Sequence, residues 1–344
     1  MKAVVLVGGG GTRLRPLTYA ILKPLVPVLN EPLVGVLMRH LARHGVDEVV
    51  LAASANDKSI EAAIGDGAAF GVKARYSYET EMMGSGLAVK EAARDFKEPF
   101  FVCNGDVLNN ADLTAMQKQH KERGAIMSIF LAPVPDPSAF GTAAIEPDNR
   151  ITKFVEKPAP GTEPSNLVNC GTWLFEPEVL DHIPDQKMDG SIERLVMPGL
   201  IEAGRLLLGF PDDAYWLDVG TPERYLQIHS DILTGKLPGW LHRDAKNGTL
   251  VGPGTTVGEG AIIAGPASIG SNCDIGARAT VERSVIWDDV SIGAGAVVVD
   301  SIIGAGCKIG PSAVLEGAIL ANGATVGASV KLGPGSKLMP GEAA

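Results

Sequence analysis

Short apolar runs alternate with amphipathic stretches through the first two thirds of the chain. Runs rich in β-branched and aromatic residues predict strands at 3–7, 48–53, 73–78 and 99–103. Between Pro32, suited to a first helical position, and Gly45, suited to a C-terminal cap, apolar residues share one helix face. Alternating strands and helices predict an α/β domain with a Rossmann-like, mixed, mostly parallel sheet and helices on both faces.

A different period begins near Val251. An aliphatic residue followed by glycine or another small residue recurs every six positions, with single-residue slips. The series is Val251, Val257, Ile263, Ile269, Ile275, Val281, Ile292, Val298, Ile303, Ile309, Leu315, Val326, Leu332 and Leu338. Such a period predicts a solenoid of about five triangular coils, with each aliphatic side chain directed inward. The pattern resembles the left-handed parallel β-helix of hexapeptide-repeat proteins.

The two patterns divide the chain into domains. We expect an α/β domain over residues 1–235, a linker over 236–247 and a β-helix over 248–344. No apolar run approaches the roughly 18 residues of a membrane-spanning helix, and the run from Val4 to Val7 is too short for a signal peptide. The four cysteines form no metal-binding or disulfide pattern, so buried, reduced thiols are expected. These features predict a cytoplasmic protein with no membrane partner.

The N-terminal thirty residues differ in charge from the rest of the chain. The formal net charge of −10 argues against nucleic acid as a partner. The first thirty residues nevertheless contain no Asp or Glu, while Lys2, Arg13, Arg15 and Lys23 are basic. This asymmetry suits the binding of a multiply charged anion.

A glycine-rich string follows the first predicted strand and reads Gly8-Gly9-x-Gly11-Thr12-Arg13-Leu14-x-Pro16. Glycines let backbone N–H groups approach phosphate oxygens, but the spacing fits neither a Walker A motif nor a dinucleotide fingerprint. It resembles the signature of the sugar-1-phosphate nucleotidyltransferases, and the resemblance continues through Lys23-Pro24. Leu22 and Glu31 depart from the family pattern. The resemblance implies that Leu6, Gly8, Gly9, Gly11 and Thr12 bind the nucleotide, and that Arg13 and Lys23 neutralise its triphosphate.

Two aspartates suit a metal ion. Asp106, in Asn104-Gly105-Asp106, follows a predicted strand, and Asp218 precedes a helix expected to start at Thr221 or Pro222. The family resemblance implies that both hold one Mg²⁺. Two carboxylates are sufficient for magnesium when phosphate oxygens and water supply the other ligands.

Three further segments resemble those that surround the sugar phosphate in the family. The implied sugar-phosphate-binding residues are Gly141, Glu156, Lys157, Asn169 and Gly171. A lysine can meet the phosphate as a compact charge, while a carboxylate and an amide can bind sugar hydroxyls.

The loop around Glu81, Gly84 and Ser85 resembles the family segment that meets the base. A carboxylate accepts two hydrogen bonds, which suits the N1–H and amino group of guanine, whereas thymine or uracil pairs better with an amide. Glu81 therefore favours GTP over the other nucleoside triphosphates.

With Ser191-Ile192-Glu193-Arg194, the pattern is similar to the mannose-1-phosphate guanylyltransferases. This implies Mg²⁺-assisted in-line nucleotidyl transfer from GTP to mannose 1-phosphate. Two alternatives stay open: a glucose-1-phosphate thymidylyl- or uridylyltransferase, and a non-catalytic homologue that binds nucleotide sugars. Acyl transfer by the solenoid is disfavoured because all six histidines precede the first hexad. We instead expect the β-helix to mediate homo-oligomer contacts.

Overall fold

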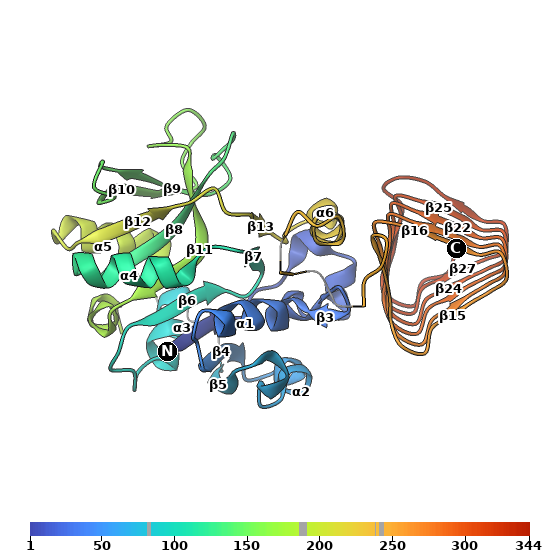
Figure 1. The fold of residues 1–344 in the computed structure, drawn as a ribbon, viewed down its shortest axis with the longest axis horizontal. Coiled ribbons are helices and arrows are strands. Elements are labelled where there is room, and N and C mark those ends of the chain that lie inside the picture. Colours follow the sequence, from blue (N-terminus) through green and yellow to red (C-terminus); the bar gives the residue numbers. More distant parts are fainter. Residues whose placement is uncertain (81–83, 186–190, 238, 241–243) are drawn as a thin grey trace. The chain divides into compact units, whose positions relative to one another are not determined.

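The computed structural model describes residues 1–80, 84–185, 191–237, 239–240 and 244–344 (Figure 1). The chain forms two compact units. The first comprises Met1–Gly8 and Val34–Asp218, and the second comprises Gly9–Leu33 and Val219–Ala344. Among the helices within the described ranges, none is long and apolar enough to span a membrane.

Four parallel strands form one half of the sheet in the first unit. They are β1 (Lys2–Leu6), β4 (Glu48–Ser54), β5 (Lys73–Glu79) and β6 (Phe100–Asn104), in the order β6-β1-β4-β5. Each coincides within a residue or two with a run that the sequence predicts as a strand. The alternation of apolar runs and helical stretches thus identified this parallel half correctly.

The other half of the sheet is mixed. It contains β8 (Met127–Pro133), β9 (Gly141–Ile145), β10 (Ile151–Glu156), β11 (Leu167–Phe175) and β12 (Leu207–Pro211). The long strand β11 runs antiparallel to β6, β8 and β9, while β12 runs parallel to β8. A separate antiparallel pair joins β7 (Val107–Asn109) to β13 (Trp216–Asp218).

Helices lie on both faces of this sheet. The helical segments of the first unit are α1 (Leu33–Arg43), α2 (Ser59–Ile64), η4 (Ala68–Phe70), α3 (Ser85–Ala92), α4 (Leu113–Arg123), η5 (Pro177–His182), η6 (Ile192–Val196, a π-helix) and α5 (Met197–Glu202). The expected position of Pro32 at the start of a helix is wrong. Pro32 pairs with Pro27 in a hairpin, and α1 begins one residue later.

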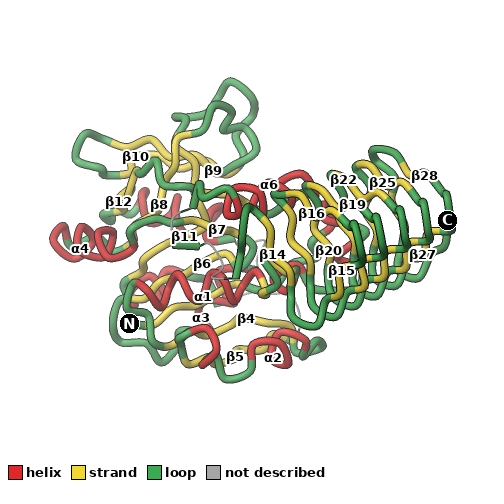
Figure 2. The backbone as a smooth tube through the Cα atoms, turned by 45° about the vertical axis from the view of Figure 1, so that its right-hand side comes forward, coloured by secondary structure: helices red, strands yellow, loops and turns green. Residues whose placement is uncertain are grey.

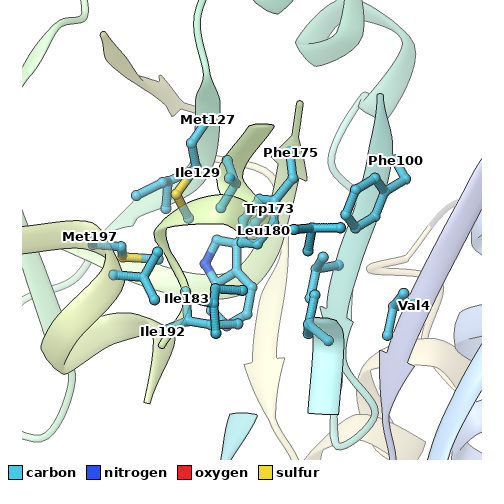
Figure 3. Packing of buried hydrophobic residues seen from close by; sticks show 14 of the residues in the cluster. Val4, Phe100, Met127, Ile129, Trp173, Phe175, Leu180, Ile183, Ile192 and Met197 are labelled. Carbon is cyan, nitrogen blue, oxygen red and sulfur yellow. The ribbon is translucent and has the colours of Figure 1, made fainter. Parts of the chain in front are cut away.

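The main core of the first unit lies on one face of the sheet. Trp173 is fully buried at its centre, between the strands and the π-helix (Figure 3). Alternation along β8 places Met127 and Ile129 in this core, whereas Ser128 points to the opposite face and bonds to His120 of α4. The sheet is therefore covered on both sides, as the sequence predicts.

The C-terminal part is a parallel β-helix (Figure 2). Its strands are β14 (Thr249–Val251), β15 (Thr256–Val257), β16 (Ile262–Ala264), β17 (Ala267–Ile269), β18 (Asp274–Ile275), β19 (Thr280–Glu282), β20 (Val285–Ile286), β21 (Ser291–Ile292), β22 (Val297–Val299), β23 (Ile302–Ile303), β24 (Lys308–Ile309), β25 (Val314–Glu316), β26 (Ile319–Leu320), β27 (Thr325–Val326), β28 (Lys331–Leu332) and β29 (Lys337–Leu338). They stack into three parallel sheets of six, five and five strands.

The predicted aliphatic positions form the core of the β-helix. Ile286 and Leu320, at which the six-residue count slips, also belong to this core. Val251 and Val257 differ from expectation, because they are 37% and 47% exposed. Their strands, β14 and β15, are edge strands with a neighbouring coil on one side only.

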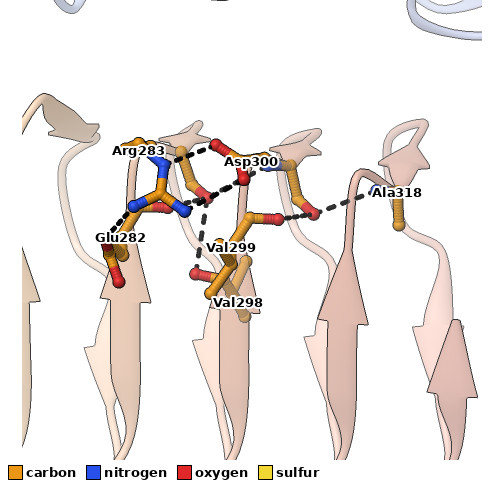
Figure 4. A network of polar contacts seen from close by, with 8 residues as sticks. Glu282, Arg283, Val298, Val299, Asp300 and Ala318 are labelled. Carbon is orange, nitrogen blue, oxygen red and sulfur yellow. Dashed lines mark hydrogen bonds and ion pairs between the residues drawn. The ribbon is translucent and has the colours of Figure 1, made fainter. Parts of the chain in front are cut away.

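Polar contacts tie neighbouring coils together at one corner (Figure 4). Arg283 forms a two-point ion pair with Asp300 one coil later. Inside the corner, the Ser301 hydroxyl donates to the Val299 carbonyl at 2.7 Å and accepts the Ala318 N–H at 3.0 Å. Buried serines thus replace backbone hydrogen-bond partners where the strands are too short to supply them.

Two elements outside the β-helix belong to the same compact unit. One is α6 (Pro222–Leu233), which starts at Pro222 as the sequence predicts and is capped by the Thr221 hydroxyl. The other is the segment from Gly9 to Leu33, which contains η1 (Thr12–Leu14), η2 (Leu17–Tyr19), η3 (Lys23–Leu25) and the hairpin of β2 (Pro27–Val28) and β3 (Glu31–Pro32).

Candidate active site

The carboxyl ends of β1 and β6 lie side by side. Leu6 is in register with Asn104, and the Gly105 N–H donates to the Leu6 carbonyl at 2.9 Å. A Cβ atom at Gly105 would lie 2.8 Å from the Leu6 carbonyl oxygen, so only glycine fits this close approach. The backbone leading to Gly8 and the carboxylate Asp106 therefore begin at the same edge of the sheet.

The second aspartate is brought to the first by the pairing of β7 with β13. Asp218 is in register with Val107, the residue that follows Asp106, although the two aspartates are 112 positions apart in the chain. Within the described residues no group of three or more His, Cys, Asp or Glu side chains is suited to a metal. Asp106, just before β7, and Asp218, at the end of β13, offer two carboxylates to a Mg²⁺ ion, which takes its other ligands from phosphate and water.

Trp216 ties this strand pair to the neighbouring segments. Its ring meets the ring of Phe140 edge to face at 5.1 Å, and its indole N–H donates to the Cys170 carbonyl at 3.1 Å. The buried Asn109 side chain also reaches from β7 to the Thr172 hydroxyl at 3.1 Å. Strand β7, which directly follows Asp106, and strand β13, which ends at Asp218, are thereby fixed against β11 and the start of β9.

Asn169 and Gly171 form a bulge in β11. The Asn169 Oδ1 accepts hydrogen bonds from the Gly171 N–H at 3.1 Å and from the Trp173 indole at 2.8 Å. The amide NH₂ of Asn169 is then the part that can donate to a sugar hydroxyl. Gly171 adopts a φ of +66°, and a Cβ there would lie 2.7 Å from the Asn104 side chain. The bulge is therefore packed directly against the residue two positions before Asp106.

Gly141, Glu156 and Lys157 lie together at the ends of β9 and β10. Glu156 is in register with Gly141, and a Cβ at Gly141 would lie 2.5 Å from a Glu156 carboxylate oxygen. Lys157 has a φ of +49°, and its side chain is 62% exposed. Burial raises the pKa of Glu156, while the charges of Lys157 and Arg194 oppose this effect. The arrangement presents an ammonium group beside a partly desolvated carboxyl group.

The π-helix contributes a second partly desolvated carboxyl group. Burial raises the pKa of Glu193, and the nearby charge of Glu156 raises it further. The hydroxyl oxygen of Ser85 accepts the Ile192 N–H at 3.0 Å, so this residue joins the start of α3 to the π-helix. Gly84 directly precedes α3 with a φ of +88°. Glu81, the predicted base-binding residue, lies outside the described residues.

The glycine-rich segment beyond Gly8 belongs to the second unit. Gly9 has a φ of +121°, which favours glycine. Gly11, with a φ of +52°, leaves 3.0 Å between the position of a Cβ and the Lys23 Cβ atom, so the lysine stem packs on the loop. The Thr18 hydroxyl donates to the Gly11 carbonyl at 2.7 Å. Thr12 and Arg13 are exposed, whereas Lys23 is 7% exposed.

The predicted site residues are divided between the two units. The first unit holds Leu6, Gly8, Gly84, Ser85, Asp106, Gly141, Glu156, Lys157, Asn169, Gly171 and Asp218, and the second holds Gly9, Gly11, Thr12, Arg13 and Lys23. Sequence reasoning assigned no role to Asn104, Glu193 or Trp216. Asn104 and Trp216 stand in the segments that contain Asp106 and Asp218, and Glu193 stands in the segment from Ser191 to Arg194. Their place in these family-like segments is the sequence feature that could have identified them.

Comparison with known proteins places these features in a family. Residues 2–235 match the nucleotidyl transferase family model, and residues 241–333 match the left-handed β-helix domain model of the eIF2B epsilon subunit. The crystal structure of a putative glucose-1-phosphate thymidylyltransferase from Bacillus anthracis superposes with a TM-score of 0.59 at 23% identity, covering 66% of this chain and 93% of that chain. That structure supports the fold of the first domain.

Several relatives extend the likeness. Mannose-1-phosphate guanylyltransferase of Mycobacterium tuberculosis is 36% identical over 294 residues, covering 84% of this chain and 80% of the relative. UTP–glucose-1-phosphate uridylyltransferase of Synechocystis is 34% identical, covering 69% and 64%. HddC from Yersinia pseudotuberculosis, complexed with GMP-PN, has a TM-score of 0.57 at 26% identity, covering 66% and 97%. The chain therefore belongs to the nucleotidyl transferase family, and its second domain is a left-handed β-helix.

Proposed function

We propose that this enzyme transfers a nucleotidyl group from GTP to mannose 1-phosphate, giving GDP-mannose and pyrophosphate. The observation that carries the proposal is the pairing of β7 with β13, which places Asp218 opposite Val107, the residue that directly follows Asp106. A single metal ion held by these carboxylates can contact the triphosphate, as phosphoryl-transfer chemistry requires.

The proposed step is a direct displacement. An oxygen of the sugar phosphate bonds to the α-phosphorus, the bond from that phosphorus to the bridging oxygen breaks, and pyrophosphate leaves with the electron pair. Arg13 and Lys23 neutralise the charge that develops on the departing group. Bound Mg²⁺ would supply further charge stabilisation and orient the phosphates. Since no covalent enzyme intermediate is needed, the four buried cysteines take no part.

The residues proposed to bind the sugar phosphate all belong to the first unit. Lys157, exposed beside Gly141, binds the phosphate as a point charge. Glu156 and the NH₂ group of Asn169 bind sugar hydroxyls, and Gly141 and Gly171 contribute through their backbone groups.

The choice of GTP and mannose rests on the relatives and on Glu81. Mannose-1-phosphate guanylyltransferases from a bacterium, frogs, zebrafish and Arabidopsis are 35–37% identical to this chain. HddC, a further structural neighbour, was solved with GMP-PN. The uridylyltransferase of Synechocystis supports glucose 1-phosphate with UTP as the alternative substrate pair.

A substrate matrix tests this proposal. Pyrophosphate release is measured with GTP, UTP, dTTP and ATP against mannose 1-phosphate and glucose 1-phosphate, with Mg²⁺ and with EDTA. We expect the highest kcat/KM for GTP with mannose 1-phosphate. A preference for UTP or dTTP with glucose 1-phosphate would favour the alternative enzyme. If no combination of nucleoside triphosphate and hexose 1-phosphate releases pyrophosphate, the result favours the alternative of a non-catalytic homologue that binds nucleotide sugars.

A further inference from the structure

The hairpin of β2 and β3 has a turn that needs outside support. Its two-residue loop, Leu29 and Asn30, has φ values of +48° and +65°, as in a type I′ turn. Such turns favour Asn or Gly, and a leucine in the left-handed region is unfavourable because its Cβ crowds the backbone. This hairpin begins four residues after Lys23. A turn with unfavourable local preferences persists only where surrounding contacts hold it.

Helix α6 supplies the first set of these contacts. The buried His229 Nε2 accepts the Leu29 N–H at 3.2 Å, while its Nδ1 lies 2.9 Å from the Tyr225 carbonyl. The hydrogen atom therefore resides on Nδ1. The Tyr225 hydroxyl donates to the Pro27 carbonyl and accepts the indole N–H of Trp287, in the β-helix, at 3.0 Å.

The β-helix supplies the second set directly. The Asn30 amide donates to the Ile269 carbonyl at 2.8 Å, and the Ser268 hydroxyl lies 3.2 Å from Asn30 Oδ1. All these contacts lie within one compact unit.

Both β-helix side chains in this network depart from the repeat. Strand register aligns Ser268 with Leu250, Val285, Ile302 and Ile319, which are aliphatic, and with Lys337 in the last strand of this sheet. The ladder of hydrogen bonds aligns Trp287 with Gly252, Gly270, Gly304 and Ala321, which are small, and with the exposed Met339 after the last strand. A buried serine and a large tryptophan are not needed to build a coil, because the other coils do without them.

The hairpin in turn is linked to the phosphate segment. The Leu33 N–H donates to the Val26 carbonyl at 3.0 Å, and the Val26 N–H donates to the Lys23 carbonyl at 3.2 Å. The Lys23 stem packs against Gly11, as described above. The chain of contacts therefore runs from the β-helix through the hairpin to the glycine-rich loop.

We propose that Asn30, Tyr225, Ser268 and Trp287 are positioning residues that make the β-helix a support for the triphosphate-binding segment. This inference rests on the proposed function, since it takes Arg13 and Lys23 to bind the triphosphate. The β-helix then affects nucleotide affinity in addition to any role in subunit contacts.

Substitutions that respect the local structure test the proposal. Asn30→Gly keeps a residue that favours the turn but removes the amide, Ser268→Val installs the residue found at Val285, and Tyr225→Phe removes one hydroxyl. Ser301→Ala is the control, because it deletes a buried hydroxyl of the β-helix that bonds only within its own corner among the described residues (Figure 4).

We expect each of the three variants to raise KM for the nucleotide about fivefold, as the loss of a hydrogen bond predicts, with KM for the sugar phosphate within about twofold of wild type. Ser301→Ala should change neither constant. Unchanged constants in all three variants would overturn the proposal, as would equal rises in both KM values accompanied by lower thermal stability.

A second readout does not depend on turnover. Hydrogen exchange of peptides covering residues 22–33 should quicken in Asn30→Gly and Ser268→Val, and should stay at the wild-type rate in Ser301→Ala. If the wild-type protein releases no pyrophosphate with any substrate, the proposed function fails, and exchange alone decides whether the hairpin is held by the β-helix. Unchanged exchange in both variants would overturn this inference.

Discussion

Gly171→Ala should lower the free energy of unfolding of the first unit by more than the cost of placing alanine in the left-handed backbone region. At a φ of +66°, an alanine costs about 1 kcal/mol relative to glycine. The added Cβ would also lie 2.7 Å from Asn104 Nδ2 and 3.2 Å from both its Cβ and Cγ atoms. Because three atoms of one side chain are crowded, the whole residue must move, at about 1–3 kcal/mol. The expected loss is therefore about 2–4 kcal/mol.

Gly124→Ala provides the matched control. Gly124 ends α4 in the same unit with a φ of +61°, and a Cβ there meets nothing within 4 Å. This variant should lose only the backbone cost of about 1 kcal/mol. Urea unfolding followed by circular dichroism measures both losses on the same compact unit.

The two glycine variants should also differ in activity. Asn104 stands two residues before Asp106, so Gly171→Ala should lower kcat while Gly124→Ala leaves it unchanged. Equal losses of stability in the two variants would refute the argument that Gly171 is required by its contact with Asn104.

Three further outcomes are expected. Arg13→Ala should slow turnover about 100- to 1000-fold at saturating substrates and Mg²⁺, and an unchanged kcat would exclude its role in charge stabilisation. Lys157→Ala should raise KM for the hexose 1-phosphate about tenfold, with Lys153→Ala, an exposed lysine on the strand that ends just before Lys157, as the control. Burial lowers the pKa of His229 from 6.5 to about 4. Because the unfolded state takes up a proton first, the free energy of unfolding is highest above pH 6.5 and falls as the pH drops towards 4. Between pH 7 and 5 this loss is about 2 kcal/mol, and His229→Gln should flatten the pH dependence of urea unfolding by that amount. If the free energy of unfolding depends on pH in the same way in the wild type and in His229→Gln, the lowered pKa of His229 is contradicted.

Local patterns were sufficient to predict most of the architecture. The strand at 99–103 follows from a continuous apolar run, which is buried on both faces of the sheet. The β-helix hexads follow from a six-residue period that directs the aliphatic side chains to one core. The failure at Pro32 has a simple cause. Proline fits both the first helical position and a strand end, and here pairing with Pro27 decided between them.

Contacts between distant segments could not be predicted in this way. No period in the sequence indicates that Asp218 pairs beside Asp106, and only the family resemblance joined them. Likewise, Ser268 and Trp287 are visible as departures from the repeat, but their contacts are not. Ser268 bonds to Asn30 of the hairpin, 238 positions away in the chain, and Trp287 reaches the hairpin only through the Tyr225 hydroxyl of α6. Residues that break the repeat can therefore mark contacts with other segments, which the six-residue period alone does not predict.

The Mg²⁺ dependence of pyrophosphate release tests the shared metal site most directly. It is measured for the wild type, Asp106→Asn, Asp218→Asn and the double variant, with the exposed Asp136→Asn as the control. If both carboxylates hold one ion, each single variant should lose at least about 100-fold in kcat/KM, and the double variant should lose little more. Losses that multiply in the double variant, or activity that persists without Mg²⁺, would contradict a single metal site at these two strands.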